Sequence, residues 1–274
     1  CKSESIKNEV TSLYKKSIAQ RKAPNEIKIY KRIGDIELEA HIFYPENFNK
    51  ADQHAAYIFF HGGSWATGMP EWGYDNCRRY AAMGMVAISI EYRLQDVHAT
   101  YISDAVADAL SAIAWVRQHS GELGINPGQI VAAGFSSGAH LAACTGMISK
   151  SNRAKYFGDD TTFNSVPNAV ILQSAAYTVE NRGAVSKAIP VESYSPMANV
   201  KDNLPTMLLM HGEFDDIVKY PEFEKFVEKM KNTNNSIVHT SFKSGHFFYN
   251  PDIIKMVNKI SDEFLATYGL IKND

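Results

Sequence analysis

The spacing of hydrophobic residues along the chain changes near residue 55. Before this point, residues 27–33 and 36–44 alternate apolar with polar side chains on either side of Gly34 and Asp35, which predicts a β-hairpin. After it, apolar residues gather in near-continuous runs separated by stretches with helical spacing. These runs are residues 56–60, 85–90, 130–133, 169–172 and 206–210. Strands of this kind are covered on both faces, so the pattern predicts an α/β protein with a parallel sheet flanked by helices.

Helical spacing is clearest over residues 101–119 and 253–268, which lie on either side of a last predicted strand at residues 237–242. The start of the chain has its own pattern. Apolar residues there recur every three or four positions, which is typical of an amphipathic helix. We therefore predict that residues 1–25 form a helical N-terminal segment that packs on the body of the protein.

The remaining residues, 26–274, are predicted to form a single domain, because α/β sheets of this size are routinely single units. Residues 147–167 and 177–204 interrupt the alternation of strands and helices with long polar connections that contain proline, glycine and tyrosine. Long loops in a compact domain usually serve function. Both are therefore predicted as lid insertions over a substrate site.

Charge and hydropathy indicate which classes of binding partner the sequence favours. The 28 Lys and Arg residues are balanced by 30 Asp and Glu residues, which leaves a net charge of -2. This balance lacks the basic excess typical of nucleic-acid binding. No apolar run approaches the ~18 residues that a membrane-spanning helix needs. The composition therefore favours small or neutral partners.

The three cysteines give one further expectation. Cys77 and Cys144 fall in predicted helices, and an odd total argues against a disulfide framework. The chain begins at Cys1-Lys2-Ser3, which is similar to the mature end of a bacterial lipoprotein after removal of its signal peptide. On this interpretation Cys1 carries lipid and tethers an exported protein in the periplasm or at the outer membrane. The alternative is a truncation boundary of a cytoplasmic protein.

The stretch from Ile130 to Ala143 contains the clearest candidate for chemistry. An apolar run leads into Gly134-Phe135-Ser136-Ser137-Gly138, and small residues with good helix formers follow. This order predicts a strand, a tight turn and a helix, in which the two glycines let strand and helix approach closely and Ser136 is presented above the strand end. A G-x-S-x-G pentapeptide is weak evidence by itself. The assignment of Ser136 as nucleophile therefore requires a base and a carboxylate elsewhere in the sequence.

A serine hydroxyl needs a base to take its proton and a carboxylate to orient that base. Among the nine histidines, His246 follows the last strand in a glycine-marked loop, whereas His239 lies within the strand. We therefore predict His246 as the base. The carboxylate is expected just past an earlier strand, where Glu213, Asp215 and Asp216 all lie. Asp215 is the preferred candidate, and its two neighbours stay open.

A third requirement is a set of backbone amides that stabilise negative charge on the carbonyl oxygen of the substrate. The sequence His61-Gly62-Gly63-Ser64-Trp65 follows a buried strand, and its glycines free the backbone to turn its N–H groups toward a substrate. The predicted oxyanion hole consists of the backbone N–H groups of Gly63, Ser64 and Ser137. Aromatic residues in and after this loop are predicted to line the substrate pocket, namely Trp65, Trp72 and Tyr74.

Together these motifs resemble the α/β-hydrolase superfamily. The most similar branch comprises the small esterases related to hormone-sensitive lipase and to bacterial carbohydrate esterases with an H-G-G-x-W signature. The resemblance covers residue 36 to the C-terminus and is specific, because several motifs recur in one order. They are H-G-G-S-W at 61–65, E-Y-R-L at 91–94, G-F-S-S-G at 134–138, S-P at 195–196, H-G-E-F-D at 211–215 and G-H at 245–246.

The resemblance implies an α/β-hydrolase fold with an eight-stranded, mostly parallel sheet and a triad in the chain order Ser, Asp, His. In the family motif H-G-x-x-D-x-x-V the aspartate is the triad carboxylate, which supports Asp215 with Val218. The sequence departs from the family at Ser64, where a third glycine often stands, and at residues 95–100, which replace a proline-rich continuation. The first departure is tolerable because only the amide is needed there. The second leaves the substrate open.

The predicted activity is hydrolysis of short-chain carboxylic esters through an acyl-enzyme, with no cofactor and no metal. If Cys1 is lipidated, acetyl or feruloyl groups on polysaccharide become the expected substrates, so the partner is a small-molecule or glycan ester. Two alternatives stay open. The H-G-G-x-W motif also resembles kynurenine formamidases, and related folds include serine peptidases, so an amide hydrolase is the first. A catalytically silent binding module is the second.

Overall fold

The computed structural model describes residues 23–158 and 162–271. Most of the predicted N-terminal segment, including its helix and Cys1, therefore lies outside the described residues. Cys77 and Cys144 are both buried free thiols. Their burial in the two helical layers agrees with the positions expected from the sequence.

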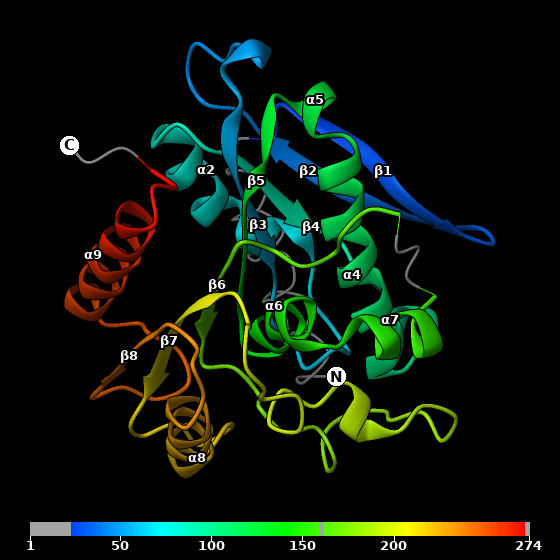
Figure 1. Ribbon diagram of the computed structural model, residues 1–274, viewed down its shortest axis with the longest axis vertical. Helices are drawn as coiled ribbons and strands as arrows, with labels where there is room; N and C mark the ends of the chain where they lie inside the picture. Colours follow the sequence, from blue (N-terminus) through cyan, green and yellow to red (C-terminus); the bar gives the residue numbers. More distant parts are fainter. Residues whose placement is uncertain (1–22, 159–161, 272–274) are drawn as a thin grey trace, which may run out of the picture.

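The predicted hairpin and buried runs form one sheet of eight strands within the described residues (Figure 1). The strands are β1 (Glu26–Ile33), β2 (Ile36–Phe43), β3 (His54–Phe60), β4 (Val86–Ile90), β5 (Ile125–Phe135), β6 (Ala169–Gln173), β7 (Thr206–Gly212) and β8 (Ile237–Phe242). Their order in the sheet is β1-β2-β4-β3-β5-β6-β7-β8. The pairs β1–β2 and β2–β4 are antiparallel, and all other neighbours are parallel. The predicted eight-stranded, mostly parallel α/β fold is confirmed.

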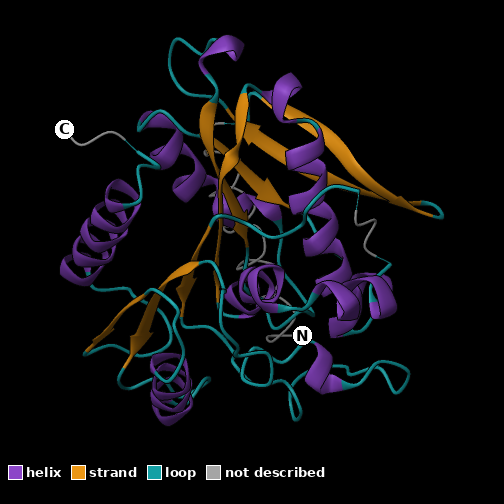
Figure 2. Cartoon of the chain, viewed as in Figure 1, coloured by secondary structure: helices purple, strands orange, loops and turns teal. Residues whose placement is uncertain are grey.

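Helices follow or precede most strands and cover the sheet (Figure 2). The α-helices are α2 (Tyr74–Ala82), α3 (Gln95–His98), α4 (Ile102–Gln118), α5 (Ser120–Leu123), α6 (Ser137–Met147), α7 (Lys150–Tyr156), α8 (Tyr220–Lys231) and α9 (Pro251–Thr267). Short 3-10 helices are η1 (Lys50–Asp52), η2 (Pro70–Gly73) and η3 (Val191–Ser193). The predicted helices at 101–119 and 253–268 correspond to α4 and α9.

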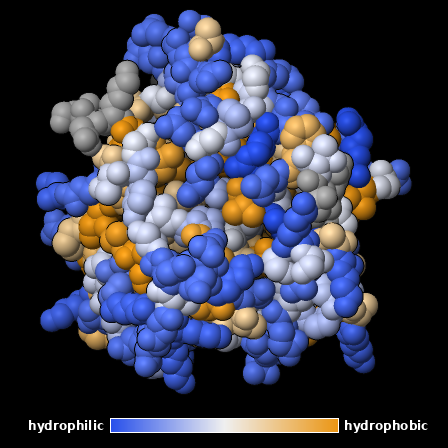
Figure 3. Space-filling view, in the orientation of Figure 1, coloured by the Kyte–Doolittle hydropathy of each residue, from blue (hydrophilic) through white to orange (hydrophobic). Residues whose placement is uncertain are grey.

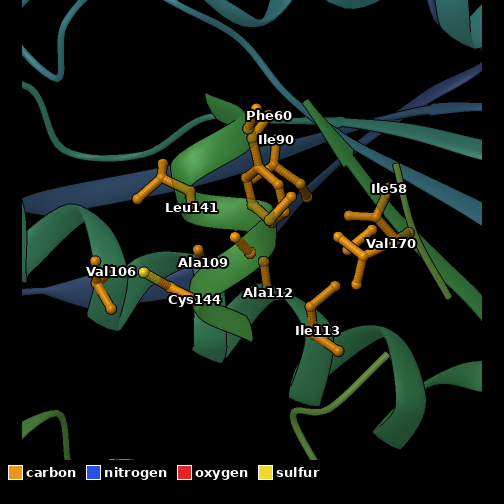
Figure 4. Close-up of a cluster of buried hydrophobic side chains, with 14 of the residues drawn as sticks. Ile58, Phe60, Ile90, Val106, Ala109, Ala112, Ile113, Leu141, Cys144 and Val170 are labelled. Atoms are coloured by element: carbon orange, nitrogen blue, oxygen red, sulfur yellow. The ribbon is translucent and has the colours of Figure 1, made fainter. Parts of the chain in front are cut away.

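Alternate residues of the buried strands enter separate hydrophobic clusters on the two faces of the sheet. In β3, Ile58 and Phe60 join the cluster covered by α4, α6 and α8, whereas Tyr57 and Phe59 join the cluster covered by α2 and α9. Figure 4 shows α6 beside α4 on one face of the sheet, with small side chains such as Ala109 and Ala112 of α4 near α6. These small residues allow α6, the helix that follows Ser136, to lie close to α4.

Helix α8 is the main element that the analysis of the sequence did not predict. It buries Phe223, Phe226, Val227 and Met230, and this i, i+3, i+4, i+7 spacing is typical of an amphipathic helix. Pro221 stands in its first turn, where proline is well tolerated. The signal for α8 was therefore present in the sequence.

Within residues 23–158 and 162–271, no helix combines the length and the apolar character that crossing a bilayer requires. The face seen in Figure 3 is largely hydrophilic, with apolar side chains in separate patches. Single exposed apolar residues include Ile254 and Met256 on α9. Two exposed aromatic residues, Phe247 and Tyr249, lie instead in the loop that carries His246.

Candidate active site

Ser136 lies at the turn between β5 and α6, with φ 55° and ψ -121°. This left-handed backbone is strained for a residue with a side chain. Two glycines make the turn possible. A Cβ atom on Gly134 would overlap the backbone of Gly138, and a Cβ atom on Gly138 would overlap the carbonyl group of Phe60. The predicted sharp turn is therefore present, and it places Ser136 where the parallel strands end.

The structure brings Ser136, His246 and Asp215 together. The distance from Ser136 Oγ to His246 Nε2 is 2.9 Å, and the distance from His246 Nδ1 to Asp215 Oδ2 is 2.7 Å. All three residues are almost fully buried, at 8%, 3% and 4% exposure respectively. Both distances are within hydrogen-bonding range, so a continuous chain of bonds runs from the hydroxyl to the carboxylate.

Geometry also separates Asp215 from the two carboxylates that the sequence left open. The second oxygen of Asp215, Oδ1, accepts hydrogen bonds from the backbone N–H groups of Ile217 and Val218, at 2.9 and 2.8 Å. Glu213 accepts instead from Ser241 at 2.9 Å, and Asp216 is exposed. Of the three candidates, Asp215 alone reaches His246.

Opposing effects act on the pKa of Asp215. Burial by itself raises the pKa of this carboxyl, but hydrogen bonds from His211, from His246 and from the Val218 N–H outweigh the burial. The resulting pKa lies well below the ordinary value of 3.8. Asp215 is therefore a carboxylate at any pH near neutrality, as a group that orients and stabilises an imidazolium must be.

Two residues with no predicted catalytic role hold this arrangement in place. His211 donates its Nε2–H to the Val218 carbonyl at 2.9 Å and lies 3.2 Å from Asp215 Oδ2. Ser174 donates its hydroxyl to the backbone carbonyl of His246 at 3.0 Å. The H-G motif could have indicated His211. No sequence signal marks Ser174, which follows β6 and takes a φ of 48°.

The loop after β3 has an unusual backbone over three successive residues. Gly63, Ser64 and Trp65 have φ values of 120°, 57° and 59°. Thr67 and Ala66 donate their backbone N–H groups to the Gly63 carbonyl at 3.0 and 3.1 Å, which closes the loop into a tight turn. Gly63 and Ser64 line the same cavity as Ser136. This position beside the serine is the one expected for the predicted oxyanion loop.

Trp65 connects this loop to α6. Its Nε1–H donates to Nδ1 of His140 at 3.2 Å, and the two rings meet edge to face with centroids 5.1 Å apart. His140 in turn donates its Nε2–H to the Tyr194 carbonyl at 2.9 Å. Since one ring nitrogen accepts and the other donates, the imidazole is neutral. Burial lowers the pKa of His140 to about 4, in agreement with this assignment.

His61 supports the other end of the loop. Its Nδ1–H donates to the Gly62 carbonyl at 2.6 Å, and its ring stacks on Tyr92 with centroids 4.3 Å apart. The Tyr92 hydroxyl donates to the His61 carbonyl at 2.7 Å. Burial lowers the pKa of His61 to about 4, so this ring is also neutral. Its Nε2 atom has no hydrogen-bond partner within the described residues.

Ser136 stands between two cavities of different size and character. The larger, about 580 Å³, is lined by His61, Ser136, His246 and several aromatic rings. These rings belong to Phe59, Trp72, Phe135, Phe247 and Tyr249. The smaller, about 210 Å³, includes Ser137, Ala176 and Arg182 in its lining. Ser64, Ser136 and Ile217 belong to both linings, so the two cavities meet at the serine.

The three aromatic residues predicted to contact substrate have different positions. Trp72 lines the larger cavity and Trp65 the smaller one. Tyr74 lines neither. It is buried against Phe43, and its hydroxyl lies 2.6 Å from His41 Nδ1. The expectation for Tyr74 is therefore corrected: this residue begins α2, and its side chain packs into the hydrophobic cluster on the α2 and α9 face.

The two predicted lid insertions also differ. From residues 177–204, Arg182 and Gly183 line the smaller cavity. The described part of residues 147–167 contributes no residue to either cavity; it contains α7 and leads into β6. Whether either segment acts as a lid stays a prediction. Within the described residues, no group of three His, Cys, Asp or Glu side chains is placed to hold a metal ion.

The known proteins that this chain resembles include several esterases. The family model BD-FAE matches residues 41–181, about half of the chain. Esterase LipC of Mycobacterium tuberculosis is 29% identical over 206 residues, which cover 66% of this chain and 49% of LipC. An arylesterase of Saccharolobus solfataricus is 29% identical over 154 residues, which cover 56% of this chain and 48% of the arylesterase. The chain thus spans about half the length of these two curated relatives.

Solved structures of Thermogutta terrifontis esterase 2 match along almost the whole chain. The apo form superposes with a TM-score of 0.83 at 33% sequence identity, covering 91% of this chain and 96% of that one. The same esterase is known with propionate bound, with butyrate bound and phosphorylated by paraoxon. The fold, the assembled site and these matches lead to one conclusion: the chain belongs to the BD-FAE family, among the serine esterases of the α/β-hydrolase fold.

Proposed function

We propose that this protein hydrolyses carboxylic esters with short acyl chains through an acyl-enzyme on Ser136. The observation that carries the proposal is the chain of hydrogen bonds from Ser136 through His246 to Asp215, at 2.9 and 2.7 Å. This geometry meets the requirement for an activated serine nucleophile, namely a base in contact with the hydroxyl and a third group that orients the base.

In the first half of the reaction, Ser136 Oγ attacks the carbonyl carbon while His246 Nε2 takes the hydroxyl proton. Asp215 accepts the hydrogen bond from Nδ1–H and stabilises the positive charge that develops on the ring. The carbonyl oxygen becomes an oxyanion, for which the backbone N–H groups of Gly63, Ser64 and Ser137 are the proposed donors. His246 then gives its proton to the departing alcohol as the C–O bond breaks.

In the second half, water takes the place of the alcohol. His246 removes a proton from the water, which attacks the acyl carbonyl and passes through a second oxyanion in the same loop. Collapse of this intermediate returns the proton to Ser136 and releases the acid. Since every proton transfer uses Nε2 of one histidine, both halves of the reaction require the same orientation of that ring.

Short acyl chains are favoured by the size of the smaller cavity, about 210 Å³. The propionate and butyrate bound to the Thermogutta esterase support a preference of this kind. The narrower hypothesis from the sequence, removal of acetyl or feruloyl groups from polysaccharide, remains part of this proposal. It predicts release of acetate or ferulate from acylated xylan.

The test compares p-nitrophenyl acetate, butyrate and octanoate as substrates for the native protein and for Ser136→Ala. We expect turnover that falls with chain length, and loss of about 10⁴-fold or more in kcat for the variant, because the nucleophile is absent. A fluorophosphonate probe should label Ser136, as detected by mass spectrometry. Ser111→Ala is the matched control, since Ser111 only bonds a carbonyl within α4.

Three other outcomes would redirect the assignment. Faster turnover of formylkynurenine or of aminoacyl amides than of esters would favour an amide hydrolase. No turnover and no probe adduct in a folded protein would favour a binding module. Activity that survives in Ser136→Ala would place the nucleophile elsewhere.

A further inference from the structure

We infer that Arg93 is a positioning residue for the proposed oxyanion loop, residues 63–65. Its guanidinium is anchored on Asp108, a buried carboxylate of α4, and through this anchor it holds the short segment 91–96 against the loop. The inference rests on the proposed esterase function and goes beyond it, because it makes the direction of the oxyanion donors depend on an ion pair that does not line the site.

The oxyanion loop has a backbone that its own side chains disfavour. Ser64 and Trp65 have φ values of 57° and 59°, in the left-handed region where a residue with a side chain is strained. Strain of this kind persists only where the surrounding structure holds the backbone in place. Contacts from outside the loop therefore determine where its N–H groups point.

The segment 91–96, which follows β4, makes three such contacts with backbone carbonyl groups. They are the Tyr92 hydroxyl to the His61 carbonyl at 2.7 Å, the Gln95 N–H to the Trp65 carbonyl at 2.9 Å and the Asp96 N–H to the Ala66 carbonyl at 3.2 Å. One bond comes before Gly63, and the other two come at and after Trp65. A shift of the segment would therefore shift the loop.

Arg93 fixes this segment to α4. Its backbone N–H and its Nε–H both donate to Asp108 Oδ2, at 3.0 and 2.8 Å, and its Nη2–H donates to Asp108 Oδ1 at 2.9 Å. Nη2 also donates to the backbone carbonyl of Asp104, one turn earlier on the helix, at 3.1 Å. A guanidinium that meets a carboxylate with two parallel bonds fixes direction as well as distance. The backbone at residue 93 is therefore held in one place.

Asp108 gives this anchor a firm base. Its side chain is 0% exposed, and that of Arg93 is 11% exposed. Lys31 of β1 lies 2.8 Å from Asp108 Oδ1, so two cations from two elements hold the same carboxylate. A buried charge requires such partners. Arg93 lines neither cavity beside Ser136, so its contribution to catalysis acts through the loop and not through contact with substrate.

The experiment compares the two cations that share this carboxylate. Arg93→Met removes the anchor of the segment, whereas Lys31→Met removes the other partner of Asp108 and leaves the anchor in place. Both variants should lose thermal stability, because each leaves a buried carboxylate with fewer donors. Arg93→Met should also lose turnover. We expect kcat on p-nitrophenyl acetate to fall about ten- to a hundredfold, with a change in KM of less than about twofold. Lys31→Met should keep the native kcat.

A trifluoromethyl ketone supplies a second readout, because its adduct with Ser136 carries a negative oxygen where the oxyanion forms. The inhibition constant of the ketone should rise in Arg93→Met by about the factor by which kcat falls, and it should stay native in Lys31→Met. Arg93→Lys keeps a charge beside Asp108 but loses the two parallel bonds. This variant should show an intermediate loss in both quantities, and it replaces Arg93→Met if that variant does not fold.

Each contrary result has a distinct meaning. Equal losses of kcat in the Arg93 variants and in Lys31→Met would show that the ion pairs only stabilise the fold, and would overturn the inference. A raised KM at native kcat, or a native inhibition constant in a variant with low kcat, would overturn it as well. Failure of the native protein to hydrolyse any ester, with Ser136 unlabelled by the fluorophosphonate probe, would instead refute the proposed function.

Discussion

The two sides of Ser136 are built by different means. On one side, His246 and Asp215 act through their side chains, and each is held by hydrogen bonds to its heteroatoms. On the other side, the loop from Gly63 to Trp65 is proposed to offer backbone N–H groups, and its conformation includes three successive positive φ values. The arrangement of groups on the first side depends on which side chains are present. The arrangement on the second side depends on which backbone conformations the residues allow.

This difference predicts how the two sides respond to substitution. A side chain on the first side can be exchanged for one of the same shape, and only its hydrogen-bonding chemistry changes. On the second side, a change that leaves every donor in place can still misdirect it, because a Cβ atom can alter the backbone. The predictions below test this contrast, in order of decreasing effect.

The largest effect is expected for Asp215→Asn. The Asn carbonyl would keep the bonds from the N–H groups of Ile217 and Val218, so its NH₂ group would face His246 Nδ1 and His211. His246 must then accept at Nδ1 and carry its proton on Nε2, where it cannot take the proton of Ser136. We expect kcat to fall about 10⁴-fold, with little change in folding, as measured by ester hydrolysis and circular dichroism.

Asp216→Asn is the matched control for this variant. It makes the same chemical change one residue away, at a side chain that is exposed. It should keep native activity. A comparable loss in both variants would mean that the loop charge, and not the bond to His246, is what catalysis requires.

A smaller loss is expected for Gly63→Ala on the other side of the serine. Gly63 has a φ of 120°, and an added Cβ would overlap the carbonyl group of Thr67. The loop must shift, which moves the N–H groups away from the oxyanion although none is removed. Loss of one such donor costs about 10²- to 10³-fold in kcat, and we expect a loss in this range.

Gly84→Ala is the control that distinguishes two causes of a loss in Gly63→Ala, namely misdirected N–H donors and backbone strain alone. Gly84 also has a positive φ, 90°, but an added Cβ there meets nothing within 4 Å. This variant should lose stability in thermal unfolding without a matching loss of kcat. If Gly63→Ala behaves in the same way, the loop does not supply the oxyanion donors.

The same contrast explains what the sequence could and could not predict. Ser136 and His246 were predicted from residue type and from the order of strands, because each must follow a strand that ends at one edge of the sheet. The same reasoning placed the carboxylate among Glu213, Asp215 and Asp216, and the preference for Asp215 rested partly on the resemblance to the family motif. Ser174 was missed because its contribution, a hydroxyl donated to the His246 carbonyl, depends on a tertiary contact over 72 residues. Nothing in its local sequence indicates that contact.

The error at Tyr74 has a local cause. Trp72 and Tyr74 are two residues apart and were assigned the same role, as neighbours in one loop would be. In the structure η2 leads directly into α2, so the two side chains point in different directions, as residues i and i+2 do on a helix. Trp72 faces the larger cavity and Tyr74 packs against Phe43. Closeness in the sequence would have indicated a shared role only if residues 72–74 formed an irregular loop and not the start of a helix.

The last of the expected effects concerns acid, and it acts on the stability of the fold and not on kcat. Two neutral histidines contact the proposed oxyanion loop, and burial lowers the pKa of both His61 and His140 to about 4, against 6.5 for an unburied imidazole. Between these values the unfolded chain binds the protons that the folded protein excludes. Stability is therefore full above pH 6.5 and is lost as the pH falls toward 4, by up to about 1.4 kcal/mol per pH unit for each histidine. Glu91 opposes this trend, because burial raises its pKa.

Thermal unfolding measured from pH 7 to pH 4.5 checks the sign and the source of this loss. His140→Asn removes one of the two titrating groups and can still accept from Trp65 Nε1, so its melting temperature should fall less steeply with acid. Asp215 has a lowered pKa and stays ionised throughout this range, so the acid–base side should be unaffected. A slope that Asp215→Asn flattens and His140→Asn leaves unchanged would show that acid acts on the side-chain half of the site. In that case the oxyanion loop would not be the part of the site that depends on buried neutral imidazoles.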